Sequence, residues 1–348
     1  MKKHLLVIVS LLILSSLTVK AQDLKDKFKF SGLMFGDYYY NLTNYDSKLK
    51  DQQAFQFRRI YFTTDIAVAE KFDARFRLEA DQGSGSLTSG GKVGVMVKDA
   101  YLKWKGFFSG SDLFFGISPT PAFDISEGAF GYRSLEKTIM DLNGIVPSRD
   151  LGVDLKGKLA ASGAVNYWVK IANNSGNAPE SDKYKRYYAS LQFKPVEGFM
   201  ATIYGDYASK ADVVDSFDKQ GKANNQYVAA FFLNYNSKDN FSLGLEGFTR
   251  KIQNGYSLGS TQALQDQNTT GISAWAWAVL SENFKAVARF DSYDPNTDKA
   301  NDGYSLYLLG LDYRAAKNVS VIPNVEIFKY QAHDTSNMVA RLTFSFTF

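Results

Sequence analysis

The chain has 348 residues, a formal net charge of +4 and a mean hydropathy of −0.25. It contains no cysteine, which excludes disulfides and metal sites with thiolate ligands. Aromatic residues make up 15% of the sequence, and the low hydropathy does not exclude a transmembrane β-barrel, because only alternate residues of its strands meet lipid.

Residues 1–21 are predicted to form a cleaved signal peptide. Lys2 and Lys3 precede an apolar run from Leu5 to Leu17, and Ala21 is a small residue suited to a cleavage site. A membrane anchor is the alternative, but it needs roughly 20 apolar residues, and this run is shorter and contains serines. The three lysines of residues 1–21 account for most of the positive charge. The domain that remains, residues 22–348, therefore has a formal charge of +1. Nucleic acid is therefore not predicted as a partner.

Extended segments fill the rest of the chain, and we predict sixteen strands. They cover residues 27–40, 54–68, 72–81, 95–105, 111–118, 149–159, 164–173, 185–194, 199–209, 225–236, 240–250, 270–280, 283–293, 303–314, 318–329 and 337–348. Short turns follow the even-numbered strands, whereas long polar loops follow the odd-numbered ones. This pattern is typical of an up-and-down outer-membrane barrel with short periplasmic turns and long outer loops.

Side chains alternate in character along these strands. In the segment 72–81, "FDARFRLEAD", Arg75 and Arg77 share one face with acidic residues, and the other face is apolar. The same alternation assigns Asp99 and Lys103 to the inner face. A soluble β-sandwich would also have two-faced strands. Strands of 10–12 residues with aromatic residues near their ends favour a membrane barrel.

Two strands fit this pattern poorly. Pro323 lies inside strand 318–329, where its missing N–H donor predicts a bulge or a shortened ladder. In strand 270–280, Trp275 and Trp277 lie on one face and alanines on the other, and either face could meet lipid or a neighbouring subunit.

The connection between Pro119 and Arg149, residues 119–148, is too long to be a simple link and is therefore predicted to be functional. It is the third outer loop. Ser134 is suited to cap a short helix that ends at about Leu142, with Asn143-Gly144 as its stop. Because a sixteen-stranded lumen is wide enough for an aqueous channel, we expect this loop to fold inward and narrow it. A lid over the mouth and an adhesive outer loop are the alternatives.

Three stretches resemble the phosphate-selective porin O and P family: "FQFRRIYFTTDIAVAEKFDARFRLEAD", "VKDAYLKWKGF" and "LFFGISPTPAFDISEGAFGYRSLE". The resemblance implies a sixteen-stranded, trimeric outer-membrane channel with the third loop in the pore. It assigns Arg58 and Arg59 to an Arg-Arg motif, and Arg133 to a loop motif. The predicted pore-lining and constriction residues are Arg58, Arg59, Arg75, Arg77, Asp99, Lys103, Arg133, Glu136, Lys137 and Arg149.

The last strand ends in "ARLTFSFTF", in which Phe344, Phe346 and Phe348 lie on one face. This pattern predicts a lipid-facing closing strand. It also resembles the C-terminal signature of outer-membrane barrels, which implies recognition by the barrel-assembly machinery.

Other chemistry is not favoured. His333 has no serine partner that would suit a hydrolase. Asp294–Gly303 has oxygen ligands at alternate positions but lacks the glycine and glutamate of a calcium loop, which favours a polar hairpin. No enzyme activity, metal or cofactor is predicted.

The sequence therefore predicts a porin in the outer membrane of a Gram-negative cell, in contact with its lipids. It would let small hydrophilic solutes or ions diffuse passively. Arginines mixed with acidic residues on the inner face predict a mild anion preference rather than phosphate specificity. The alternative is an outer-membrane barrel with an adhesive or structural role and no open channel.

Overall fold

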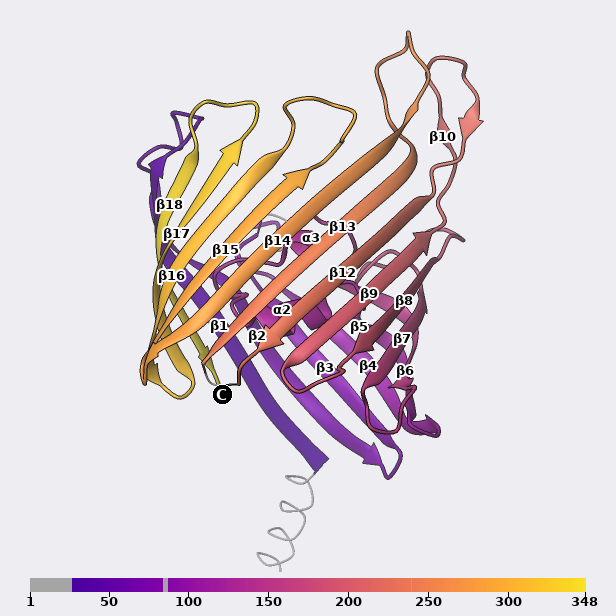
Figure 1. Ribbon diagram of the computed structural model, residues 1–348. Coiled ribbons are helices and arrows are strands. Elements are labelled where there is room, and N and C mark those ends of the chain that lie inside the picture. Colours follow the sequence, from indigo (N-terminus) through magenta and orange to yellow (C-terminus); the bar gives the residue numbers. More distant parts are fainter. Residues whose placement is uncertain (1–26, 84–86, 239) are drawn as a thin grey trace, which may run out of the picture.

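The structure is a computed structural model, and it describes residues 27–83, 87–238 and 240–348. The predicted signal peptide, residues 1–21, lies outside the described residues. Over the described ranges, sixteen antiparallel strands pair with their neighbours in chain order, and β18 pairs with β1 to close a barrel (Figure 1). None of the helices in these ranges is both long enough and apolar enough to cross a membrane.

All sixteen predicted strands are confirmed. Their bounds are β1 (Phe28–Thr43), β2 (Gln53–Ala69), β3 (Phe72–Ala80), β4 (Val95–Phe108), β5 (Ser111–Pro119), β6 (Arg149–Lys158), β7 (Val165–Ala172), β8 (Arg186–Phe193), β9 (Phe199–Ala208), β12 (Gln226–Asn236), β13 (Phe241–Tyr256), β14 (Gln265–Ser281), β15 (Phe284–Asp294), β16 (Tyr304–Ala316), β17 (Val319–Tyr330) and β18 (Asn337–Thr347). The long connections lie at one end of the barrel, at the top of Figure 1.

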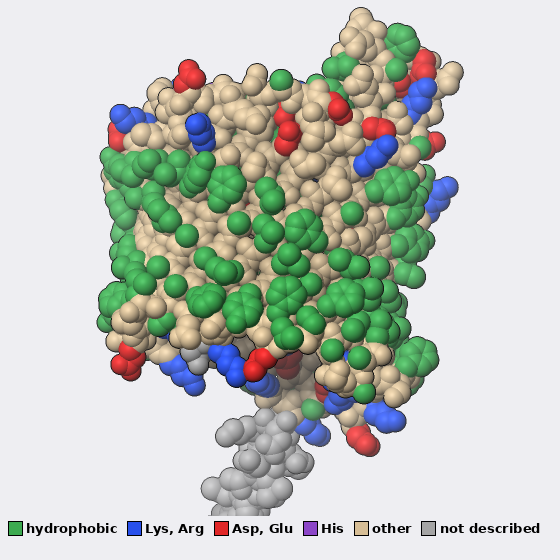
Figure 2. Space-filling view, in the orientation of Figure 1, with side chains coloured by type: hydrophobic (Ala, Val, Ile, Leu, Met, Phe, Trp, Pro, Cys, Tyr) green, Lys and Arg blue, Asp and Glu red, His purple; other side chains and the backbone are tan. Residues whose placement is uncertain are grey.

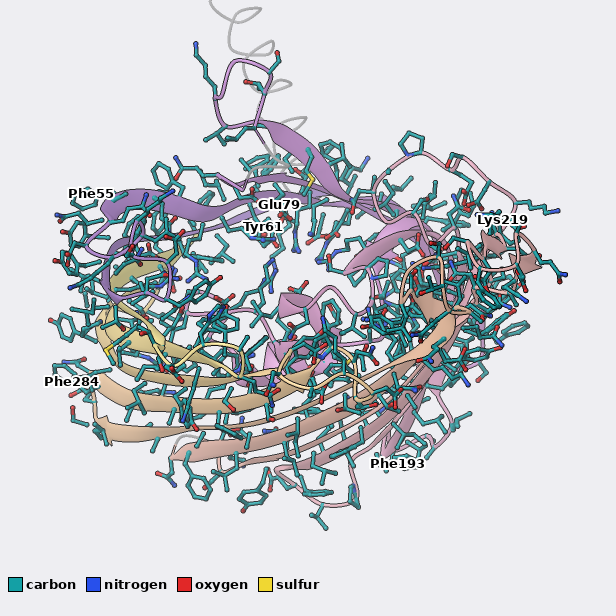
Figure 3. All side chains as sticks on the ribbon, turned by 90° about the horizontal axis from the view of Figure 1, so that it is seen from above. Phe55, Tyr61, Glu79, Phe193, Lys219 and Phe284 are labelled. Atoms are coloured by element: carbon teal, nitrogen blue, oxygen red, sulfur yellow. The ribbon has the colours of Figure 1, made fainter. Side chains whose placement is uncertain are left out.

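The predicted two faces of the strands are also confirmed. Along β8 and β15, charged and polar side chains such as Arg186 and Asp291 are buried, whereas Tyr187 and Phe290 are exposed on the outer wall. In Figure 3 the labelled Tyr61 and Glu79 lie on the inner side of the ring, and Phe193 lies on its outer side. Figure 2 shows hydrophobic side chains over the wall and charged ones near both rims. Lipid can therefore solvate the exterior of the barrel.

The outer end of the barrel differs from the prediction. Strands β13 and β14 continue into the segment 251–269, which was predicted as a loop, and a small hairpin, β10 (Val213–Val214) with β11 (Gly221–Lys222), lies in the loop 210–224. The extensions of β13 and β14 are mostly polar, and the hairpin strands have only two residues each, so these segments lack the alternation that identifies a strand in a sequence.

Both poorly fitting strands now have an explanation. Around Pro323 the β16–β17 ladder has no pairs between Gly310–Asn324 and Tyr313–Val321, as the shortened-ladder prediction required. On β14, Trp275 and Trp277 are buried on the inner face, whereas Ala274 on the other face is exposed.

The closing seam joins β18 to β1. The backbone of Phe348 forms two hydrogen bonds with Gly32, of 2.9 and 3.1 Å. The ring of Phe348 lies over Gly32, where an added Cβ would be 2.1 Å from the ring, and Phe344 similarly approaches Gly36. Glycine leaves the space in which an aromatic ring covers the backbone of the neighbouring strand.

We expect Gly32→Val to impair closure, because the added side chain displaces the Phe348 ring and overpacking typically costs about 1–3 kcal/mol. The measurement is the yield of the heat-modifiable barrel form after refolding into lipid vesicles. Gly205→Val on β9 is the matched control, since the nearest atom to an added Cβ there is 3.7 Å away. Equal yields for the two variants would contradict a role for this seam.

The third loop differs from the single predicted helix. It contains α2 (Asp124–Phe130), which was not predicted, and α3 (Ile139–Leu142), which covers only the end of the predicted helix. Arg58 donates hydrogen bonds to the carbonyls of Ser134 and Leu135, and these carbonyls would be needed as acceptors inside a helix. Tertiary contacts therefore override the local helix signal.

Candidate functional site

Two β-bulges shape the inner wall on either side of β3. In the β1–β2 ladder, Phe35 pairs with Arg59 and Gly36 with Phe57, so Arg58 is an extra residue. In the β3–β4 ladder, Arg77 pairs with Asp99 and Leu78 with Val97, so Lys98 is extra. A bulge breaks the strict alternation of side chains. Consecutive charged residues can therefore face inward, which avoids a charge in lipid.

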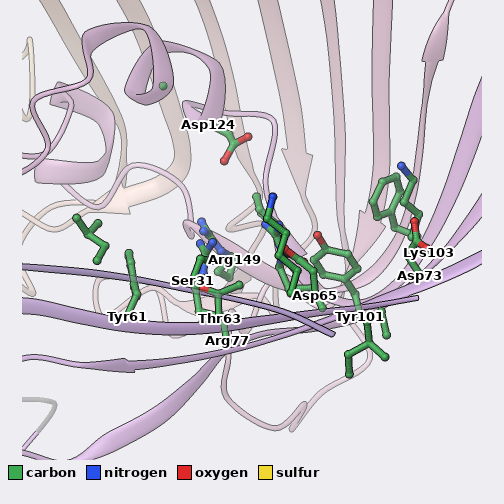
Figure 4. Close-up of a pocket in the computed structure, with 18 of the residues that line it drawn as sticks. Ser31, Tyr61, Thr63, Asp65, Asp73, Arg77, Tyr101, Lys103, Asp124 and Arg149 are labelled. Carbon is green, nitrogen blue, oxygen red and sulfur yellow. Dashed lines mark hydrogen bonds and ion pairs between the residues drawn. The ribbon is translucent and has the colours of Figure 1, made fainter. Parts of the chain in front are cut away.

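Two buried carboxylates organise the cations beside these bulges. Glu79 accepts from Arg59 at 2.6 Å and pairs with Lys98 at 2.9 Å. Asp99, whose side chain is fully buried, pairs with Arg149 at 2.5 Å and with Arg77 at 3.3 Å. Each carboxylate thus serves two cations, which leaves positive charge in excess on this part of the wall. Figure 4 shows Arg77 and Arg149 side by side.

Side chains of the strands hold the backbone of the third loop. Arg58 donates to two loop carbonyls, as described above, and its Nη2 pairs with Glu136 at 3.2 Å. Arg289 on β15 donates to the carbonyl of Lys137, and Gln226 on β12 donates to the carbonyl of Ile145. The loop is therefore attached to widely separated strands.

Apolar packing covers the opposite part of the inner wall. One cluster joins the loop residues Phe123, Ile139, Met140, Ile145 and Val146 to β7, β8, β9, β12 and β13. A second joins Phe130, Tyr132 and Leu135 to strands between β12 and β17, including both buried tryptophans. Since apolar surface is stabilised by burial, these contacts fix the loop against β7–β17.

Part of the remaining space forms a cavity of about 1020 Å³ beside β1–β6 (Figure 4). Its lining, counted over the described residues, includes eight Lys and Arg side chains and four Asp and Glu side chains. The cations are Lys27, Lys29, Arg75, Arg77, Lys103, Arg133, Arg149 and Lys156. Fixed charges of one predominant sign, surrounded by a wall of low dielectric constant, attract ions of the opposite sign.

The loop contributes a charged group of its own to this cavity. Arg133 pairs with Glu127 at 2.8 Å and also with Asp141. Burial raises the pKa of the Glu127 carboxyl, and Arg133 offsets only part of that rise. For Asp141 the effect of burial is outweighed by Arg133 and Lys137, which hold the pKa of this carboxyl below its usual range.

The structure brings together half of the predicted pore residues. Arg75, Arg77, Lys103, Arg133 and Arg149 line the cavity. The other five, Arg58, Arg59, Asp99, Glu136 and Lys137, lie outside its lining, where they support lining residues or attach the loop. Phe344 and Phe346 lie on β18, where Phe346 pairs with Met34, and Phe348 follows directly after its end.

Sequence reasoning missed Lys98, because alternation assigned its position to the lipid face. The signal was present in "VKDAY": two consecutive charges in a spanning strand would place one of them in lipid at a cost of about 2–4 kcal/mol, which favours a bulge.

The residues 294–303 form the predicted polar turn, in which Asp294 accepts from the backbone N–H of Asn296 at 3.0 Å. Across the described ranges, no group of three or more His, Asp or Glu residues is arranged to hold a metal ion.

The chain is similar to known porins. Its residues 28–198 match the family described as phosphate-selective porin O and P. Among solved structures, the anion-selective porin from Comamonas acidovorans has 12% identity and a TM-score of 0.65, with 92% of this chain and 99% of that chain covered. The outer-membrane channel DcaP of Acinetobacter baumannii has 13% identity and a TM-score of 0.66, with 92% of this chain and 97% of that chain covered. OprB of Pseudomonas putida has 11% identity and a TM-score of 0.67, with 95% of this chain and 96% of that chain covered. No curated protein matches the chain in sequence.

Proposed function

We propose that this chain, which belongs to the phosphate-selective porin O and P family through residues 28–198, is an outer-membrane porin for small hydrophilic solutes and ions. Diffusion through it is passive, with a mild preference for anions. The observation that carries this proposal is the cavity beside β1–β6, in whose described lining Lys and Arg outnumber Asp and Glu by eight to four.

The third loop, in this proposal, lies in the lumen and forms its constriction. The support is its contacts: Tyr132 donates to Asp312 on β16 at 3.0 Å, Tyr304 on β16 donates to Asn143 at 2.9 Å, and both apolar clusters join the loop to inner-face residues. The constriction then lies between Arg133 of the loop and Arg77 and Arg149 of the wall, which all line one cavity. A permeating anion would exchange part of its hydration shell for these cations.

The remaining parts of the proposal concern export and assembly. Residues 1–21 direct the chain to the periplasm, and the aromatic residues of β18 present the barrel to the assembly machinery. The exposed apolar wall contacts outer-membrane lipids (Figure 2). By analogy with the family, three copies form a homotrimer.

Planar bilayers test the proposal directly. Purified full-length protein should give stepwise conductance, and the reversal potential in a potassium chloride gradient should have the sign of anion preference. A protein that retains heat-modifiable mobility but conducts no current would favour the adhesive or structural alternative.

The ion pairs of Arg133 with Glu127 and Asp141 in the third loop predict that the ion preference depends on pH. Because the pKa of Glu127 is raised, acidification below neutral pH protonates Glu127 while Asp141 stays charged, and Arg133 is then less completely neutralised. We expect the anion preference to increase as the pH falls from about 7 to about 4. The reversal potential, measured as a function of pH, checks this.

The matched variants for this experiment are Glu127→Gln and Asp124→Asn, since both carboxylates line the cavity. At neutral pH, Glu127→Gln should already show the reversal potential that the unmodified protein shows at acidic pH. Its reversal potential should change little as the pH is lowered further. Asp124→Asn should keep the pH dependence, because no described ion pair joins Asp124 to Arg133. An unchanged pH profile in Glu127→Gln would refute the assignment.

A further inference from the structure

Three of the eight cations that line the cavity, Lys27, Lys29 and Lys156, form no ion pair with any residue in the described ranges, and Lys156 is the one held among aromatic rings. Five of the lining cations form ion pairs: Arg75 with Asp65, Lys103 with Asp112, Arg77 and Arg149 with Asp99, and Arg133 with its loop carboxylates. Lys156 on β6 forms no ion pair and no hydrogen bond with any residue in the described ranges. An ammonium group in this position attracts anions from solution.

Aromatic rings surround this ammonium. The Nζ atom of Lys156 lies 3.4 Å from the ring centroid of Trp168 on β7 and 4.5 Å from that of Phe114 on β5. Lys103 approaches the same Phe114 ring at 5.5 Å, and Tyr101 meets it edge-on at 5.5 Å. Cation–π contacts of this kind hold an ammonium in place without neutralising it.

The carboxylates nearest in the strand register are already occupied. Asp112, which lies opposite Lys156 in the β5–β6 ladder, pairs with Lys103 at 2.9 Å and accepts from the backbone of Gly106. Asp154 accepts from Trp168 at 2.6 Å and pairs with Lys170 at 2.9 Å. These bonds also fix the indole ring. The arrangement is therefore preorganised, with an ammonium group that forms no direct ion pair next to apolar surface.

We propose that Lys156, with Lys103, Phe114 and Tyr101, forms a binding subsite for small organic anions that carry a ring, such as aromatic carboxylates. The two ammonium groups bind the carboxylate, and the aromatic side chains contact the ring and exclude water. The subsite rests on the proposed function for its role in permeation. Its existence as a binding site does not depend on conduction.

The test uses full-length protein in detergent with benzoate and acetate as probes. Saturation-transfer difference NMR gives the dissociation constant of each probe without requiring an open channel. Lys156→Met should raise the benzoate dissociation constant about tenfold, because a charge-assisted hydrogen bond is lost. Lys158→Met is the matched control: it removes the same charge from the same strand, outside the cavity lining. This variant should bind benzoate like the unmodified protein.

Phe114→Leu tests the aromatic part. It should weaken benzoate binding while leaving acetate binding unchanged. Equal benzoate binding by Lys156→Met and the unmodified protein overturns the subsite, and equal losses for acetate and benzoate in Phe114→Leu overturn its preference for rings.

Bilayer recordings on the same samples separate the two proposals. Benzoate binding by a silent protein supports the subsite and refutes the porin, whereas conductance without benzoate binding refutes only the subsite.

Discussion

Replacing Arg77 and Arg149 together by glutamine should abolish the anion preference that we propose for the channel. Both arginines line the cavity, and both pair with Asp99, whose side chain has no exposed surface. The double variant removes two of the eight lining cations and leaves a buried carboxylate without a counter-ion. We expect the reversal potential in a potassium chloride gradient to fall to zero or to change sign toward cations.

The design has two controls. Lys251→Gln removes one positive charge from an exposed position on β13, outside the cavity lining, and should leave the reversal potential unchanged. Adding Asp99→Asn to the double variant should move the reversal potential part of the way back, because the unpaired carboxylate is then neutral. If the double variant keeps the original reversal potential, these arginines do not set the ion preference.

Replacing Arg58 should release the third loop. Its guanidinium group binds the carbonyls of Ser134 and Leu135 and pairs with Glu136, and the Arg58 side chain is only 15% exposed. Breaking a buried pair costs about 3–5 kcal/mol, and we expect about 2–3 kcal/mol here because solvent partly screens the group. Arg58→Ala should therefore give larger and noisier single-channel currents while the barrel stays folded.

Limited trypsin digestion provides a second measurement. Release of the loop should expose cleavage sites after Arg133 and Lys137, which are half-buried in the structure. Arg58→Lys keeps the charge but lacks the fork that reaches two carbonyls, so it should show most of the effect. Arg75→Lys is the control, since Arg75 pairs with Asp65 on the wall. Trypsin resistance of Arg58→Ala equal to that of Arg75→Lys would show that the loop does not depend on Arg58.

Five of the ten predicted pore residues line the cavity, and three of these could be predicted for a local reason. Arg75, Arg77 and Lys103 alternate with apolar neighbours on regular strands, so their direction follows from their position alone. Lys98 and Lys156 were not predicted. Lys98 faces inward only because a bulge shifts the register of its strand. Lys156 forms no ion pair because the nearby Asp112 and Asp154 already pair with Lys103 and Lys170.

The sequence by itself determined the sixteen strands, their inner and outer faces and the order in which they pair. These properties follow from the two-residue period of a strand and from the loop lengths, which are local features of the chain. Only the tertiary structure decided the path of the third loop and the two bulges. The loop carbonyls and apolar side chains find partners far away in sequence, such as Asp312, which lies 180 residues beyond Tyr132. A pattern confined to neighbouring residues carries no information about such contacts, whereas closure of the barrel brings them together.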